Sequence, residues 1–239
     1  MLLGLASVLL LAVLGWQMFG TKLGQPQRDR TGLFTTLPIL WNESADLAGI
    51  LKPDQEPHWA EKLIAGGGAI APLDILATSG LKPLQYLVIA QPRPLSPDEN
   101  VALDGWVRSG GKLLLFADPM LTEDSAFALG DKRRPQDTVL LSPILKHWGL
   151  ELVFDESQVF GERSVEVMGS KVPVNLPGRF AVLDPVRCRV WGEGLAATCA
   201  ISKGRVLVLA DAAVLERDDA AGTRAKALRQ LLDAAFVGR

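Results

Sequence analysis

The sequence has few of the side chains that metal sites and many enzyme centres use. Its 239 residues include only 2 His and 2 Cys. His58 and His147 each stand beside a tryptophan, far apart in the chain, and no H-E-x-x-H or C-x-x-C motif occurs. The sequence therefore predicts no metal site and no bound cofactor.

A block of basic residues is also missing. The chain carries 25 Lys+Arg against 27 Asp+Glu, a formal net charge of −2, with a pI near 5.8. A nucleic-acid-binding surface needs clustered positive charge to meet the phosphates. DNA and RNA are therefore not expected as partners.

Motifs for nucleotide and covalent chemistry are absent as well. Gly111-Lys112 is followed by Leu113, so no P-loop is present, and no G-x-S-x-G or equivalent cysteine turn supplies a nucleophile. Two glycine stretches, 66–71 and 192–197, come near a dinucleotide fingerprint. The first follows a predicted helix and the second lies in a predicted hairpin, so both are interpreted as turns. The chain is not expected to be an enzyme.

The N-terminus is a long apolar segment. Its first 19 residues are polar only at Ser7 and Gln17, and as a helix they would span roughly 28 Å, close to the hydrocarbon thickness of a bilayer. A cleaved signal peptide is the alternative, but no small-x-small cleavage site follows the apolar run. We expect a transmembrane anchor at 1–20, a polar linker at 21–32 and an α/β domain at 33–239.

Residues 84–118 predict a strand, a helix and a second strand. LQYLVIAQ (84–91) is continuously apolar, as in a strand covered on both faces. Ser96, Pro97 and Glu99 form a capping box with proline at the first helical position, and Gly110-Gly111 ends the helix. KLLLFAD (112–118) is the second strand, so the unit is βαβ and its sheet is parallel.

A second stretch repeats part of this pattern. SGGKLLLFAD (109–118) aligns with SKGRVLVLAD (202–211), which predicts two buried strands that each end in an aspartate. The closing segment 223–236 has apolar residues at helical spacing and predicts a last helix. The domain is therefore expected to be α/β, with a mostly parallel sheet and flanking helices.

Residues 150–201 differ from this pattern. Short alternating runs broken by Gly and Pro predict a β-rich insertion of antiparallel hairpins. A turn at Glu193-Gly194 would pair Gly192 with Leu195, Val190 with Ala197, Cys188 with Cys199 and Val186 with Ile201. The two cysteines are then either packed as small apolar residues or joined in a disulfide.

Polar residues gather at the predicted strand ends, which meet at one edge of a parallel sheet. In one interpretation they form a ligand pocket, with two carboxylates as acceptors and three arginines as anion contacts: Asp118, Asp211, Arg93, Arg133 and Arg134. In the other, each Asp caps the following turn and the arginines pair with Asp131 and Asp137 or are solvated. The second is favoured because no nucleophile or general base completes the set.

The stretch LVIAQPRPLSPDENVALDGWVRSGGKLLLFADP (87–119) resembles the auxiliary component of gliding-motility-type ABC transport systems. The family shares the apolar strand, the proline-rich turn, an LS-x-x-E helix start, a GGK-LLVF-DP strand and a later G-x-V-x-V-x-AD strand. The resemblance implies a class I glutamine-amidotransferase-like, flavodoxin-like α/β domain beside a separate permease and ATPase. The amidotransferase Cys and its His-Glu partners are missing from this sequence.

Together these observations predict a non-catalytic, membrane-anchored accessory protein of an ABC-type transport or envelope system. It is expected to bind a ligand or a partner protein, which would be an ABC permease or ATPase or another membrane protein. A degenerate hydrolase and a small-ligand-sensing domain are the alternatives. The resemblance implies a single-pass protein of the bacterial inner membrane with a periplasmic body. Lys22, Arg28 and Arg30 follow the anchor, which by the positive-inside rule indicates the opposite orientation.

Overall fold

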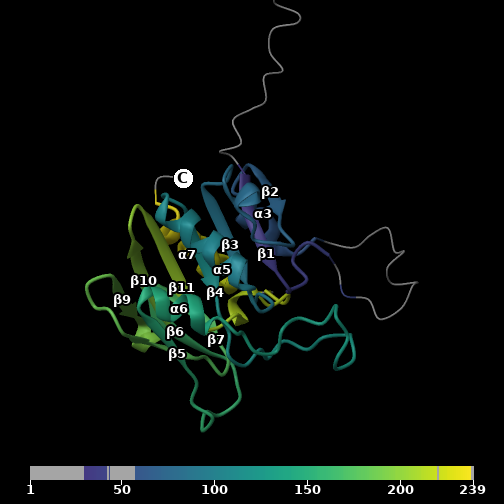
Figure 1. Ribbon diagram of the computed structural model, residues 1–239. Helices are drawn as coiled ribbons and strands as arrows, with labels where there is room; N and C mark the ends of the chain where they lie inside the picture. Colours follow the sequence, from purple (N-terminus) through teal and green to yellow (C-terminus); the bar gives the residue numbers. More distant parts are fainter. Residues whose placement is uncertain (1–29, 42, 44–56, 220, 238–239) are drawn as a thin grey trace, which may run out of the picture.

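The computed structural model describes residues 30–41, 43, 57–219 and 221–237 (Figure 1). Its centre is a seven-stranded sheet in the order β2-β1-β3-β4-β11-β10-β9. The strands are β1 (Arg30–Thr35), β2 (Ala69–Pro72), β3 (Tyr86–Ala90), β4 (Lys112–Phe116), β9 (Cys188–Trp191), β10 (Ala196–Ile201) and β11 (Gly204–Leu209).

Five of these strands run parallel. Each neighbouring pair from β2 to β11 is parallel, and β10 and β9 then extend the sheet in antiparallel fashion. Counted along the chain, the parallel strands follow the order 2-1-3-4-5 of flavodoxin-like doubly wound sheets. The predicted α/β class with a mostly parallel sheet and flanking helices is confirmed.

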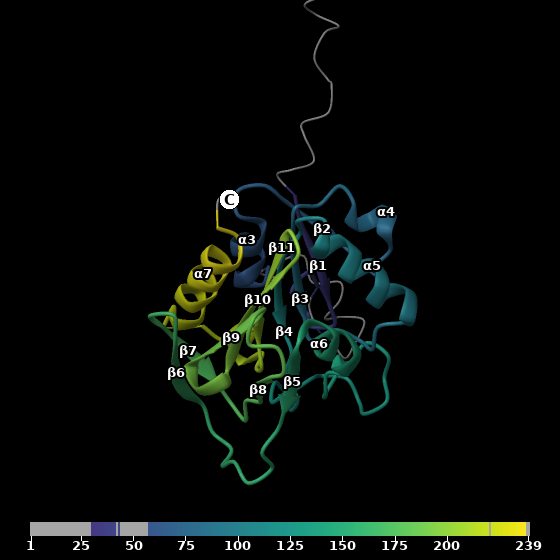
Figure 2. The same cartoon turned by 60° about the vertical axis from the view of Figure 1, so that its left-hand side comes forward.

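Helices cover both faces of the sheet (Figure 2). One buried cluster joins the sheet to α3 (Trp59–Ala65) and α7 (Thr223–Ala235). The other joins the opposite face to α4 (Thr78–Leu81), α5 (Pro97–Arg108) and α6 (Ser142–Trp148). Because strands alternate their side chains, Leu114 and Phe116 face the first cluster while Leu113 and Leu115 face the second.

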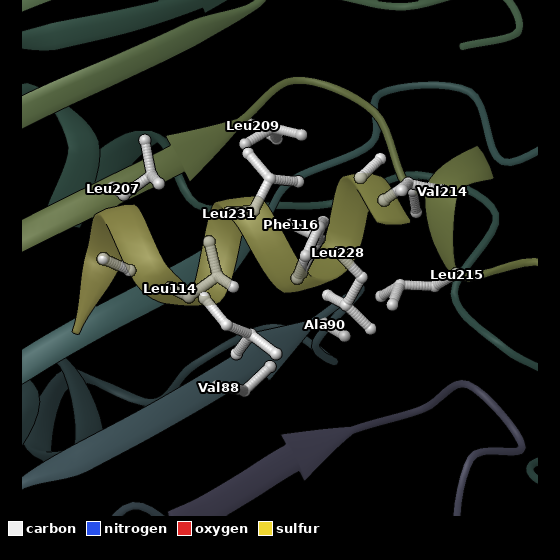
Figure 3. Close-up of a cluster of buried hydrophobic side chains, with 14 of the residues drawn as sticks. Val88, Ala90, Leu114, Phe116, Leu207, Leu209, Val214, Leu215, Leu228 and Leu231 are labelled. Atoms are coloured by element: carbon white, nitrogen blue, oxygen red, sulfur yellow. The ribbon is translucent and has the colours of Figure 1, made fainter. Parts of the chain in front are cut away.

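The helix α7 packs along the middle of the sheet (Figure 3). Its Leu228 and Leu231 lie over the apolar side chains of β3, β4 and β11, and both are buried. Burying a side chain of this size contributes about 1.5–3 kcal/mol. The last predicted helix, at 223–236, is thus confirmed to within one residue.

The capping box predicted before α5 is present. Ser96 Oγ accepts a hydrogen bond from Glu99 N, and the Glu99 carboxylate accepts one from Ser96 N. Arg108 is the last residue of α5, and Gly110, with a φ of 115°, lies in the turn that leads into β4. The βαβ unit therefore forms as the sequence predicts.

Two boundaries differ from the prediction. The first strand starts at Arg30, so residues 30–32 of the predicted linker belong to β1, which pairs with β2 from its first residue. The predicted insertion 150–201 also ends too late, because β9 and β10 are strands of the main sheet. β10 pairs with β11, and its Ala197 and Cys199 are buried on the α5 side of the sheet.

The rest of the predicted insertion forms two small antiparallel sheets. One pairs β5 (Leu150–Val153) with β8 (Arg179–Val182), and the other is the hairpin β6 (Arg163–Val167) and β7 (Ser170–Val174). The prediction of antiparallel hairpins in this region is confirmed.

The hairpin register predicted around the cysteines is correct at its centre. Val190 pairs with Ala197 and Cys188 pairs with Cys199. The structure joins the two cysteines by a disulfide, with Cα atoms 4.2 Å apart. The turn contains the short 3-10 helix η2 (Gly192–Gly194), closed by a bond from Leu195 N to Gly192 O. The pairing predicted for Val186 is wrong, because Val186 lies in a turn organised by Asp184 and is exposed.

The predicted anchor at 1–20 lies outside the described residues. Within the part of the chain that the structure describes, none of the helices is long and apolar enough to cross a bilayer.

Candidate site at the carboxyl ends of β3, β4 and β11

The residue after β3 has an unusual backbone. Gln91 is fully buried and has a φ of 43°, a conformation that non-glycine residues rarely adopt. Its side chain joins β3 to the segment after β4: Oε1 accepts from Asp118 N at 3.0 Å, and Nε2 donates to Asp118 O at 3.0 Å and Gln136 O at 2.8 Å. Gln91 therefore holds two strand ends and a loop together.

Asp118 lies at the end of β4 and is buried. Its Oδ1 accepts a hydrogen bond from Met120 N at 2.8 Å, which closes the turn through Pro119. Its Oδ2 accepts from Ala212 N at 3.0 Å and so reaches across to the end of β11. Both carboxylate oxygens are therefore bonded to backbone amides, as in a turn cap.

Asp211 has the same role one strand away. Its Oδ1 accepts from Ala213 N at 2.7 Å, at the start of the short 3-10 helix η3 (Ala213–Leu215). Its Oδ2 accepts from Asn175 N at 3.0 Å, which ties the end of β7 to the main sheet. The buried pair of aspartates thus organises the backbone where three segments meet.

Both carboxylates have a raised pKa. Burial is the main cause that raises the pKa of Asp118 to about 6, against the lowering effect of its two backbone hydrogen bonds. Burial, and next the charge of Asp118, raise the pKa of Asp211 well above its usual value. The pair is therefore less acidic than exposed aspartates would be.

Glu216 acts on both aspartates, and it also acts on a further acidic group, Glu123. Glu216 adds negative charge near both aspartates and is itself paired with Arg224. Burial raises the pKa of Glu123 to about 7, although its carboxylate accepts a hydrogen bond from Arg217 N. In the described chain, no group of three or more His, Cys, Asp or Glu residues has the arrangement of a metal site.

His58 takes part in the packing of a helix. Its Nδ1 accepts a hydrogen bond from Ala60 N and so caps α3. Burial, and next the nearby charge of Arg217, lower the pKa of His58 to about 4. It is therefore a neutral, structural histidine at ordinary pH.

Arg93 bonds with residues other than the two aspartates. Its guanidinium forms a two-pronged pair with Glu99, at 2.9 and 2.7 Å, and donates to Asp74 O at 2.7 Å. It lines a cleft of about 440 Å³ between α4 and the start of α5. Arg93 thus supports the helix start and does not join the predicted pocket.

The other two arginines pair within their own loop. Arg133 bonds both oxygens of Asp131 and lies over the ring of Phe127. Arg134 donates to Asp137 Oδ1 at 3.2 Å and to Phe127 O at 3.0 Å. Of the five predicted site residues, the structure brings together only Asp118 and Asp211.

The sequence did not reveal the partners that hold these aspartates. Asn175 contributes only its backbone N–H to Asp211, and its place follows from a turn after β7 that no motif marks. Gln91 stands at a strand end before a Pro-rich turn, and that position was its only indication in the sequence. The site is therefore a buried network of backbone caps at the carboxyl edge.

Residues 68–168 match the sequence family described as an ABC-type uncharacterized transport system. This segment covers less than half of the chain and includes Gln91 and Asp118 but not Asp211. No curated protein sequence matches the chain.

Several solved structures are similar in outline. A cytoplasmic protein from Salmonella typhimurium has a TM-score of 0.48 and 12% identity, with 86% of this chain and 96% of that one covered. A ThuA-like protein from Bacteroides uniformis has a TM-score of 0.47 and 11% identity, with 92% and 98% covered. The GH42 β-galactosidase Gan42B has a TM-score of 0.45 and 12% identity, with 77% of this chain covered. This chain spans about a third or less of that enzyme and of the two glycosidases beside it.

Proposed function

We propose that this chain is a non-catalytic accessory component of a bacterial ABC-type transport system. Residues 1–20 anchor it in the inner membrane, the body lies in the periplasm, and it acts by binding the membrane-embedded permease. The match of residues 68–168 to an ABC-type transport family supports the association with transporter partners.

The observation that carries the non-catalytic part is the strand-to-helix turn at Gln91. A nucleophile elbow holds Ser or Cys in a strained conformation at such a turn, where the side chain is free to attack a substrate. Here the strained residue is a glutamine, and its amide is engaged by Asp118 and Gln136. Asp118 in turn uses both carboxylate oxygens on backbone amides. The Gln91 and Asp118 side chains therefore hold the backbone of the turn, and neither is free to react with a substrate.

The disulfide supports the periplasmic location. Such bonds persist in oxidising compartments and are rare in the cytosol. Cys188 and Cys199 lie opposite one another in adjacent strands and are buried, so the pair is well placed to stay oxidised there.

A small-ligand-sensing or hydrolytic role for the strand-end carboxylates is the second candidate. The observation in its favour is the raised pKa of Asp118 and of Asp211, since strongly perturbed groups are common at functional sites. The Asp118 variants discussed below separate this role from the structural one.

The test is to purify the full chain from cross-linked membranes and identify what comes with it. We expect an ABC permease and its ATP-binding subunit to co-purify. Leu10→Arg with Leu11→Arg should abolish this, since each arginine costs about 3 kcal/mol inside a membrane helix. Leu129→Arg, in an exposed loop, is the matched control and should change nothing. A chain that fractionates with membranes but brings no transport component would contradict the proposal.

A further inference from the structure

An open groove runs along the outer side of α5. It has a volume of about 1010 Å³ and lies between α5 and the segment that links α4 to β3. Its lining on α5 consists of Val101, Ala102, Gly105 and Trp106, and Val101 is 73% exposed. We call this the α5 groove; its lining includes Leu81, Lys82, Ala102, Gly105, Ser109 and Gly110.

Gly105 has no explanation inside the described chain. It lies in the interior of α5, where glycine is the poorest residue after proline, yet a Cβ at this position would meet no atom within 4 Å. Other glycines nearby are explained by close contacts: a Cβ at Gly111 would lie 2.5 Å from the Trp106 ring, and one at Gly204 would lie 1.9 Å from Val107 O. Because Gly105 has no side chain and faces open space, the backbone of another chain can approach it closely.

Gly105 has an exposed residue one helical turn away on either side. Val101 lies one helical turn before it and Ser109 one turn after it, and all three are exposed on the same line along the helix. A two-fold axis through Gly105 would place Val101 of one copy against Ser109 of a second. An interface with this symmetry uses the same surface on both copies.

The charges near the two ends of α5 are complementary under the same symmetry. Asp98 is exposed two turns before Gly105, roughly 10 Å along the axis. Near the other end of α5, the Cβ of Lys203 lies 4.0 Å from the Cβ position of Gly110. Lys82 also lines the groove. Within the described chain, the side chains of these three residues form no hydrogen bond or ion pair. An antiparallel second copy would set Asp98 beside Lys203 of the first.

We propose that the α5 groove is the surface through which a second copy of this chain binds, antiparallel and related by a two-fold axis at Gly105. The close helix contact at Gly105 provides the fit, and the Asp98 and Lys203 charges select the antiparallel orientation.

The packing is tested with the full chain in detergent by sedimentation velocity over a range of concentrations. Gly105→Leu should weaken self-association at least tenfold, while its melting temperature stays the same or rises because a helix glycine is removed. The control is Arg229→Leu on the exposed side of α7, which should leave association unchanged. A chain that stays monomeric, or a dimer unaffected by Gly105→Leu, would overturn the proposal.

The orientation is tested by exchanging charges, which does not depend on how a leucine packs. Asp98→Lys and Lys203→Glu should each weaken association several-fold, because two such contacts form per dimer. The double variant should recover most of the loss. Recovery is expected only if the two residues meet between copies, since they lie near opposite ends of α5 in one copy. Additive losses in the double variant would contradict the antiparallel arrangement.

Cross-linking gives an independent check of the register. The chain has 2 Cys, and they are bonded to each other, so a new cysteine supplies the one free thiol. A mixture of the Val101→Cys and Ser109→Cys variants should oxidise to a dimer that joins the two positions. Val101→Cys alone should give little cross-linked dimer, because the two cysteines of such a dimer lie roughly 12 Å apart along the helices. Efficient self-linking of Val101→Cys would reject the proposed register.

Discussion

Asp118 illustrates how a strand-end carboxylate can be buried, perturbed and still structural. Two backbone amides from different segments, those of Met120 and Ala212, each require an acceptor at the same point. A carboxylate has enough lone pairs for both, whereas an amide side chain has only one acceptor oxygen. The residue is therefore explained by hydrogen bonding alone.

Replacing Asp118 tests this explanation. Asp118→Leu leaves two buried N–H groups without a partner and should lower the free energy of unfolding by about 2–4 kcal/mol. Asp118→Asn keeps one bond and removes the repulsion with Asp211, so at pH 7 it should stay within about 1 kcal/mol of the wild type. Denaturant unfolding measures both, with the exposed Asp124→Asn as the control. A folded Asn variant that loses transport function would instead indicate a chemical role.

The pH dependence of stability provides a second residue-scale prediction. The pKa of Asp118 is about 6 in the folded chain, against an ordinary 3.8, so the folded state binds more protons between these values. Stability from this group therefore falls as the pH rises from about 4 to about 6, by on the order of 3 kcal/mol. Asp211 acts in the same direction.

His58 has the opposite effect over part of the same range, because its pKa is lowered to about 4 and its stability contribution is lost as the pH falls. The informative quantity is therefore the difference between the wild type and Asp118→Asn, measured by unfolding at pH 4.5 and pH 7.5. The variant should gain stability relative to the wild type as the pH rises. Equal slopes would mean that Asp118 is not perturbed.

At the scale of the elements, the N-terminal end of α5 is stabilised by more than its capping box. The Glu99 carboxylate also accepts from Leu76 N at 3.1 Å and pairs with Arg93, and Arg93 lowers the pKa of Glu99 to about 2. Glu99→Ala should therefore lower the free energy of unfolding by about 2–3 kcal/mol, since two N–H groups and a guanidinium lose their acceptor. Thermal and denaturant unfolding measure it, with the exposed Glu156→Ala expected within 0.5 kcal/mol, roughly the scatter of surface changes.

The hairpin of β9 and β10 carries a prediction about the disulfide. The sequence separation of 11 residues closes a short loop, for which chain entropy predicts a stabilisation of about 3 kcal/mol. Replacing both Cys188 and Cys199 by Ala should cost about that amount. Alkylation of unreduced protein from native membranes, followed by mass spectrometry, should find both thiols blocked by the bond. Alkylation of both cysteines without reduction would remove the main support for export.

The elements that the sequence predicted well are those specified locally. The strand at β3, the cap at Ser96 and the glycine turn before β4 each need only neighbouring residues, and all three were correct. Membership of a sheet is a long-range property, so the recruitment of β9 and β10 into the main sheet was not predicted. The register around Cys188 was predicted because alternation within one hairpin fixes it.

At the scale of the whole molecule, the candidate site was predicted only in part. Parallel topology brings strand ends together, so the meeting of Asp118 and Asp211 followed from two similar strands. The arginines could not be placed in this way, because each lies outside a strand and pairs with a nearby acid: Arg93 with Glu99, Arg133 with Asp131 and Arg134 with Asp137. An arginine can pair with an acidic residue nearby in the chain or contribute to a distant site, and the sequence does not show which of the two occurs.

The anchor gives the last prediction. We expect residues 1–20 to remain attached and a C-terminal reporter that works only outside the cytoplasm to be active. The three basic residues after the anchor oppose this orientation, so the fusion is a demanding test. The matched control carries the reporter on the Leu10→Arg, Leu11→Arg variant, which should lose membrane association. Mature protein in the soluble fraction, with its N-terminus beyond residue 20, would show that the segment is cleaved.

The place of β1 in the sheet has a mechanical consequence. The strand that follows the N-terminal segment is an interior one, held between β2 and β3 by two parallel ladders. A pull between that segment and the carboxyl edge acts along the strand axis and loads these ladders in shear, so many hydrogen bonds resist at once. Peeling an edge strand would break them one at a time. If residues 1–20 anchor the chain as proposed, the body resists forced unfolding at the point where the tension enters.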